Sequence, residues 1–123
     1  MSAGNIHFFF TLREQLKVYH WQTTSFAQHK ATDEIIKELD ESIDLFVEVY
    51  IGKYGRPRIT PATSTITIKN LTPNTIVKFV KQALEYLQKN LTKQLKGNDT
   101  DLINIRDEMV GNLNKLLYLF TLK

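Results

Sequence analysis

The stretch His29–Glu48 reads HKATDEIIKELDESIDLFVE, and its apolar residues recur every three or four positions. This is the period of an α-helix that buries one face. With the residues that follow, the segment supplies an apolar stripe of Thr32, Ile36, Leu39, Ile43, Phe46, Val47 and Tyr50. A single helix cannot cover such a stripe, so the stretch predicts a long helix within a multi-helix core.

Three further segments show the same helical period. Together with the helix that contains His29–Glu48, which is the second along the chain, the four segments span about residues 5–21, 25–53, 73–96 and 100–120. Ser25 followed by Gln28 resembles a capping box, and Thr72 before Pro73 is a typical helix start. Four amphipathic helices of comparable length predict an all-α protein: one four-helix bundle domain over residues 1–123.

The connection RPRITPATSTITIKNLT, residues 56–72, contains Pro57 and Pro61 and no obvious short helix. It is long enough to run the length of a bundle, whereas the other links are short and favour antiparallel neighbours. These lengths favour an up-down-down-up bundle of the ferritin type, with a long crossover between the second and third helices. A plain up-down-up-down bundle is the alternative.

Composition narrows the class of protein. The chain has no cysteine, which excludes disulfides, thiolate metal sites and a cysteine nucleophile, and fits a reducing, cytoplasmic setting. The apolar run Ile6–Leu12 is too short to span a membrane. Net charge is only +3, and residues 1–5 contain no lysine or arginine, which argues against a DNA-binding tail.

Four side chains of metal-ligand type lie on one face of the second predicted helix, residues 25–53. With His29 as the reference, Asp33, Asp44 and Glu48 fall at about 40°, 60° and 100° around the helix axis. They flank the apolar stripe. Asp33 and Asp44 are about 16 Å apart along the axis, so one metal ion cannot use both pairs of one chain.

The numbering suggests how the two pairs could meet. His29 and Glu48 are centred on the same point of the chain as Asp33 and Asp44, between Glu38 and Leu39. If the helix packed antiparallel on its own copy about a two-fold axis at this point, His29 would meet Glu48 of the copy and Asp33 would meet Asp44. Lys37 and Asp40 share this centre and could pair across the axis.

Such a dimer would hold two identical sites, each with one imidazole and three carboxylates. Nitrogen and oxygen ligands of this kind suit Fe(II), Mn(II) or Zn(II), and open positions on the metal admit dioxygen or peroxide. The Glu-x-x-His motif of larger di-iron bundles is absent from the sequence, which argues for a site between subunits. The alternative is that these four residues belong to an ordinary solvated helix face.

The pattern resembles the ferroxidase signature of Dps-type mini-ferritins. That family has His-Trp near the end of its first helix, here His20-Trp21, and H-x3-D-x10-D-x3-E on its second, here His29 to Glu48. Phe26, three residues before His29, also matches. The likeness covers about residues 5–58, and the last two helices match only as bundle helices.

The resemblance implies an iron-oxidising and iron-storing protein that protects against oxidative stress. His20 would join His29 and Asp33 of one subunit as iron ligands, with Asp44 and Glu48 supplied by the two-fold mate. Trp21 would lie beside the iron and absorb reactive oxidant. The family oxidises Fe(II), preferably with hydrogen peroxide, and stores the product in a hollow dodecamer.

The chain also departs from the family. The loop WQTTSFAQ between His20 and His29 is shorter, and neither the basic N-terminal tail nor the short helix of the middle connection is evident. These differences weaken the expectation of a dodecamer and, more strongly, the expectation of DNA binding. The rival function is a non-catalytic structural or assembly protein that kept the ferritin-like fold.

Overall fold

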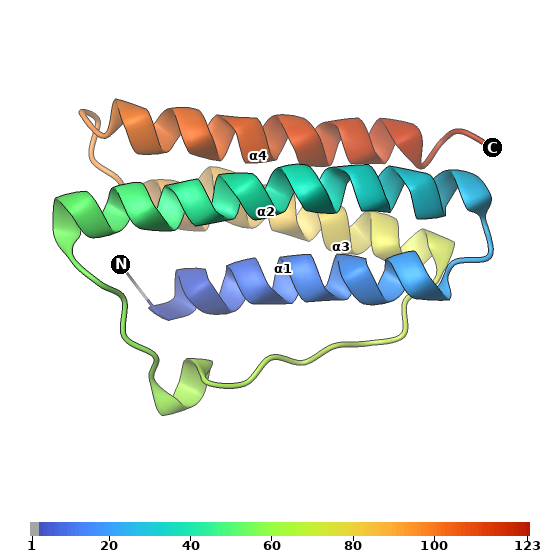
Figure 1. Ribbon diagram of the computed structural model, residues 1–123, viewed down its shortest axis with the longest axis horizontal. Helices are drawn as coiled ribbons and strands as arrows, with labels where there is room; N and C mark the ends of the chain where they lie inside the picture. The colour runs from blue at the N-terminus through green and yellow to red at the C-terminus, as the bar shows by residue number, and fades with distance from the viewer. Residues whose placement is uncertain (1–2) are drawn as a thin grey trace.

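The computed structural model describes residues 3–123 and consists of helices joined by turns and loops (Figure 1). The four main helices are α1 (Ala3–Gln22), α2 (Phe26–Tyr54), α3 (Pro73–Glu85) and α4 (Thr100–Leu119). Three short elements complete the fold: η1 (Pro61–Thr63), η2 (Tyr86–Leu91) and η3 (Thr92–Gln94). No strand occurs in the described part of the chain, so the prediction of an all-helical bundle is confirmed.

Contacts between side chains fix the direction of α4 relative to α2. At one end, Lys53 near the end of α2 pairs with Asp101 in the first turn of α4 at 2.7 Å. At the other end, Glu34 in the first part of α2 pairs with Lys115 near the end of α4 at 2.8 Å. The two helices are therefore antiparallel.

Two further contacts fix the direction of α3 relative to α1. Tyr86, which follows α3, donates a hydrogen bond to Asn5 near the start of α1 at 2.6 Å. Gln22, at the end of α1, donates one to Asn70, just before α3, at 2.8 Å. The helices α1 and α3 are therefore antiparallel. Since α1 and α2, which a three-residue turn joins, also run in opposite directions, α2 and α3 point the same way (Figure 1).

The connection between α2 and α3 passes alongside α1 from one end of the bundle to the other (Figure 1). The buried side-chain amide of Gln15 anchors this connection. Its NH2 group donates to the carbonyl of Lys69 at 2.8 Å, and its oxygen accepts from the backbone N–H of Lys69 at 2.9 Å. The connection contains one 3-10 turn, η1, so the expectation of no short helix was wrong. Thr60 caps this turn and Pro61 opens it.

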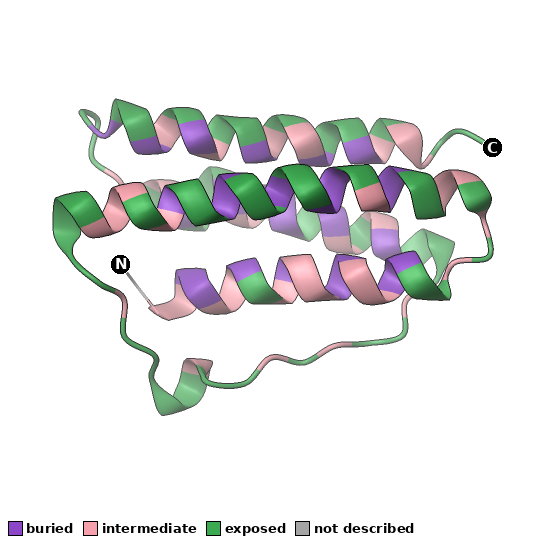
Figure 2. Ribbon diagram, viewed as in Figure 1, coloured by how far each residue is buried: buried purple, intermediate pink, exposed green. Residues whose placement is uncertain are grey.

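Residues that are buried lie on the inner faces of all four helices (Figure 2). From the predicted stripe of α2, the structure buries Thr32, Ile36, Leu39, Ile43 and Phe46. The other two stripe residues, Val47 and Tyr50, are half-buried and pack against the core. The apolar period of the sequence therefore predicted correctly which face of α2 turns inward.

Both predicted helix starts are present. The Ser25 hydroxyl accepts the N–H of Gln28 at 3.2 Å, and the Thr72 hydroxyl accepts the N–H of Thr75 at the same distance. Pro73 occupies the first turn of α3. These caps satisfy amides that a helix start leaves without a backbone partner.

The third helix is shorter than the sequence predicted. Regular α-helix ends at Glu85, and the chain continues as a π-helical turn, η2, and a 3-10 turn, η3. The Thr92 hydroxyl donates to the carbonyl of Leu87 at 3.0 Å, and such side-chain bonds to the backbone compete with the α-helical ladder. The prediction of continuous α-helix up to Gly97 was therefore wrong.

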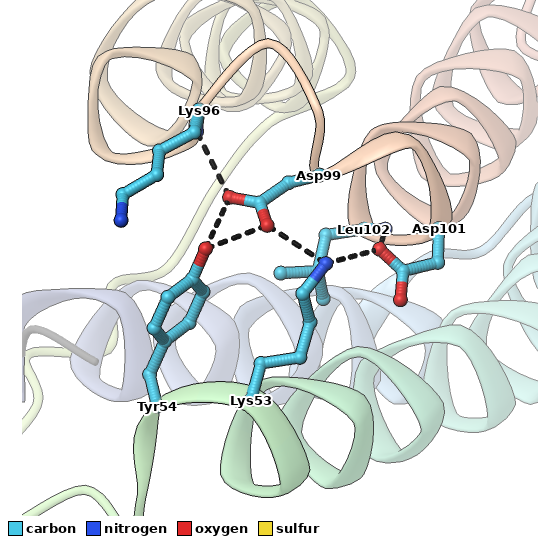
Figure 3. Close-up of polar contacts among 6 residues, drawn as sticks. All are labelled: Lys53, Tyr54, Lys96, Asp99, Asp101 and Leu102. Carbon is cyan, nitrogen blue, oxygen red and sulfur yellow. Dashed lines mark hydrogen bonds and ion pairs between the residues drawn. The ribbon is translucent and has the colours of Figure 1, made fainter.

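A polar cluster fastens the end of α2 to the start of α4 (Figure 3). At its centre is Asp99, whose side chain is 2% exposed. Lys53 contacts this carboxylate at 2.7 Å, and the Tyr54 hydroxyl donates to its two oxygens at 2.6 and 2.8 Å. The backbone N–H of Lys96 donates at 2.9 Å, and Lys53 also reaches Asp101. Both carboxylate oxygens of Asp99 thus have partners.

These donors lower the pKa of Asp99 to about 2, with the bond from Lys53 as the largest cause and the bond from Tyr54 next. A carboxyl group whose pKa is lower in the folded than in the unfolded chain stabilises the fold above its unfolded pKa of about 3.9. That stabilisation is lost as the pH falls toward 2.

We therefore expect Asp99→Asn to lower the melting temperature at pH 6, by an amount that shrinks as the pH falls from about 5 to 2. Thermal melts across this range measure the difference from the parent. Asp101→Asn is the matched control, because Asp101 also pairs with Lys53 but is 52% exposed, and its effect should be small. An equal loss for both variants at pH 6 would contradict this account.

Within residues 3–123, no helix is both long and apolar enough to cross a membrane.

Candidate metal site

The turn between α1 and α2 brings the two predicted histidine ligands together. The rings of His20 and His29 stack with their centroids 3.9 Å apart and their planes at 14°. Since only three residues, 23–25, join α1 to α2, the short link holds His20 against the start of α2. His20 is 5% exposed and His29 is exposed, so the pair lies where the interior meets the surface.

Each histidine is held by the other's backbone. The Nδ1 atom of His20 lies 2.8 Å from the carbonyl oxygen of His29, and the Nδ1 atom of His29 lies 2.9 Å from that of His20. A carbonyl only accepts, so both Nδ1 atoms carry the proton. In the neutral rings both Nε2 atoms then keep a free lone pair, which is the arrangement found in metal-binding histidines.

Thr32 gives His20 a further buried partner. Its hydroxyl oxygen lies 3.0 Å from Nδ1 of His20 and donates to the carbonyl of Gln28 at 2.8 Å. Since the hydroxyl proton is used on the backbone, its oxygen accepts from His20. The sequence pattern placed Thr32 in the apolar stripe and did not predict that it contacts His20. A hydroxyl-bearing residue on the buried face, three residues after His29, could have indicated a polar partner there.

Asp33 follows one turn after His29 on the same face of α2. Its side chain is 43% exposed and lies 3.3 Å from Nζ of Lys37. The hydrogen bond from Lys37 is the largest cause that lowers the pKa of Asp33, and the positive charges of Lys37, of His20 when it is protonated and of Lys17 lower it further. Asp33 therefore lies within the electrostatic reach of the histidine pair and stays ionised.

Asp44 and Glu48 form a second group farther along α2, and both are exposed. The pKa of Glu48 is raised, first by a hydrogen bond with the Asp44 side chain and second by the negative charge of Asp44. Two carboxyl groups this close resist losing both protons. A cation placed between them would remove that repulsion.

The structure therefore brings His20 and His29 together at one level of α2, with Asp33 nearby, and brings Asp44 and Glu48 together at another. Within residues 3–123 of a single chain, no three histidine, aspartate or glutamate side chains are arranged to hold a metal ion. The length of helix between Asp33 and Asp44 accounts for the separation of the two groups.

Trp21 extends from the end of α1 beside His20 and is 68% exposed. The Lys17 ammonium lies 5.4 Å from its ring centroid. Beside Asp44, α1 and α2 enclose a hollow that is lined by Ile6, Phe9, Phe10, Arg13, Asp40, Glu41, Ile43, Asp44 and Val47.

Comparison with known proteins places the chain in a family. Residues 20–120, which include all five candidate ligands, match the family of unknown function DUF5856, and the chain belongs to that family. An "Uncharacterized 14.6 kDa protein in mobD-ri intergenic region" of Enterobacteria phage T4 is 31% identical over 104 residues, which are 85% of this chain and 75% of the T4 protein. No solved structure matches the chain.

Proposed function

We propose that the protein is a Dps-like ferroxidase whose iron site forms between two copies of the chain. In this arrangement α2 packs antiparallel on its copy about a two-fold axis near Leu39. His20, His29 and Asp33 of one copy then face Asp44 and Glu48 of the other. The directions of the four helices and the long connection after α2 support a ferritin-like bundle, the fold that such an assembly needs.

The observation that carries the proposal is the state of the two half-sites. On one side, the Nδ1 atoms of His20 and His29 are both taken up by backbone carbonyls, which leaves the Nε2 atoms as the nitrogens that could bind a metal. On the other side, the exposed carboxyl groups of Asp44 and Glu48 lie close enough for Asp44 to raise the pKa of Glu48. The first group would supply nitrogen ligands, and the second would supply oxygen ligands with negative charge.

In the proposed reaction Fe(II) is the substrate. The carboxylates of Asp44 and Glu48 capture the cation and neutralise part of its charge, while neutral imidazoles complete the ligand set without adding charge. Each Fe(II) loses one electron. Hydrogen peroxide takes two electrons and two protons and becomes two water molecules, so two Fe(II) are consumed per peroxide; dioxygen is the slower alternative oxidant. Mn(II) and Zn(II) would occupy the same ligands.

Iron storage would follow if the dimers assemble into a closed cage such as a dodecamer. The ferric product would then collect inside, and the protein would remove both peroxide and free Fe(II) from a cytoplasmic compartment. A DNA-binding role is not part of the proposal, because residues 1–5 contain no lysine or arginine that could contact phosphate groups.

The direct test is Fe(II) loading without oxygen, followed by hydrogen peroxide. We expect a rise in ferric absorbance at two Fe(II) per peroxide, faster than in protein-free buffer, with inhibition by Zn(II). Oxidation at the rate of buffer alone would overturn the proposal.

One observation favours a structural or assembly role instead. Two acids of the proposed interface already have partners in their own chain, since Asp33 pairs with Lys37 and Asp40 pairs with Arg13 at 2.8 Å. Native mass spectrometry with metal analysis separates the two functions. An oligomer that binds no iron supports the assembly role, and a monomer without iron contradicts the ferroxidase.

A further inference from the structure

Trp21 is a large aromatic side chain that lies mostly in solvent. It is 68% exposed, and its ring contacts the Lys17 ammonium. Tryptophan buries more area than most side chains, and exposed tryptophans are enriched at protein interfaces. An exposed tryptophan beside a candidate site therefore indicates a surface that another molecule covers.

The hollow beside Asp44 has a lining whose chemistry suits an indole ring. Its buried lining is apolar and consists of Ile6, Phe9 and Ile43, with half-buried Val47 beside them. Its more exposed lining carries Phe10, with Arg13 5.2 Å from its ring centroid, and three acids, Asp40, Glu41 and Asp44. An apolar lining accepts the ring, and the acids can accept the indole N–H and attract a nearby cation.

The register of α1 on α2 fixes which part of the copy faces this hollow. His20 lies level with His29, and Arg13 lies level with Asp40, which it contacts at 2.8 Å. Lys17, between them on α1, is therefore level with about Asp33. Since the ring of Trp21 extends back toward Lys17, it lies at the same level.

This step rests on the two-fold arrangement of the proposed function. That arrangement places Asp33 of one copy opposite Asp44 of the other. The level of Trp21 and Lys17 then coincides with the level of the hollow, which Asp44 lines. Lys17 arrives with Trp21 and faces Glu41 and Asp44, the two acids of the hollow that are not paired with Arg13, so the two surfaces are complementary in charge.

We infer that Trp21 anchors the dimer by inserting into the hollow between α1 and α2 of the second copy, next to Asp44. The indole covers the apolar lining, and Lys17 faces Glu41 and Asp44. Burial of Trp21 also closes one side of the iron site against bulk water. Trp21 therefore contacts the second copy even when no iron is bound, and this role is independent of any part that it plays during iron oxidation.

Trp21 is the single tryptophan of the chain, so its fluorescence reports on this contact directly. In metal-free protein, we expect emission to shift to shorter wavelength and iodide quenching to fall as the concentration rises and sedimentation shows dimers. A dimer in which Trp21 stays fully quenchable, or a chain that stays monomeric at every concentration, would overturn the inference.

Two variants sharpen the test. Val47→Phe fills the hollow, and Trp21→Ala removes the anchor; each should weaken dimerisation at least about tenfold. Tyr118→Ala is the control, because it removes an aromatic side chain that is 61% exposed on α4, and it should leave dimerisation unchanged. A helical spectrum and a melt like the parent's would show that Trp21→Ala is folded.

The anchor and the ferroxidase activity can fail separately. If Trp21 becomes buried on dimerisation but the protein does not oxidise Fe(II), the anchor is right and the ferroxidase is wrong. If the protein oxidises Fe(II) as a dimer with Trp21 exposed, the anchor is wrong.

Discussion

Replacing Asp44 and Glu48 by alanine together should slow Fe(II) oxidation by more than about 100-fold, since even outer partners of metal ligands cost about 10- to 100-fold when they are removed. The two carboxylates supply most of the negative charge of the proposed site. Without them, the histidines of the second copy face a surface that cannot neutralise Fe(II). The measurement is the initial rate of ferric absorbance after peroxide addition.

The same helix offers a matched control. Glu34 and Glu38 have the same four-residue spacing as Asp44 and Glu48 but lie on a different face of α2, and both are exposed. Glu34→Ala with Glu38→Ala removes the same charge and breaks only the exposed contact with Lys115, so oxidation should proceed at the parent rate. If both double variants retain parent rates, Asp44 and Glu48 are not iron ligands.

Reversing one charge at the centre of the proposed interface should weaken the dimer strongly. The two-fold arrangement places Lys37 opposite Asp40 of the copy, twice per dimer. Lys37→Asp would set two pairs of acids against each other, and Asp40→Lys would set two pairs of lysines. Like charges placed together across an interface are strongly unfavourable, so each variant should dimerise at least about tenfold more weakly.

A mixture of the two charge variants should dimerise again. The Lys37→Asp chain has acids at both positions and the Asp40→Lys chain has lysines at both, so both contacts across the axis become attractive. Native mass spectrometry distinguishes the heterodimer by mass. If the variants dimerise alone as well as the parent does, the two-fold axis does not lie near Leu39. Melting curves of each variant control for the loss of the Arg13–Asp40 contact within the chain.

The features that the sequence predicted well depend on local patterns. The buried stripe of α2 follows from its three- and four-residue spacing, and the starts of α2 and α3 follow from Ser25 and Thr72. The end of α3 could not be predicted in this way. There the Thr92 hydroxyl bonds to the carbonyl of Leu87 and competes with the α-helical ladder, and the apolar period of the sequence gives no sign of this bond.

In the candidate site, too, features within one helix were predicted from the sequence, whereas contacts between helices were not. Residue type and helical spacing predicted that His29, Asp33, Asp44 and Glu48 share a face of α2, because one helix carries them all. How His20 and His29 hold each other, and how Thr32 supports His20, depends on the turn that folds α1 onto α2. The Asp99 cluster was missed for a similar reason, since Lys53 and Asp99 are far apart in sequence.

The most direct test of the shared site combines two inactive variants. One carries Asp44→Ala and Glu48→Ala, and the other carries His20→Gln and His29→Gln, in which the amide can keep a hydrogen bond to the backbone. Each alone should fail to oxidise Fe(II). After unfolding and refolding together in equal amounts, about one site in four should combine intact halves from two chains, so we predict roughly a quarter of the parent activity. A mixture as inactive as its components would contradict a site formed between two copies.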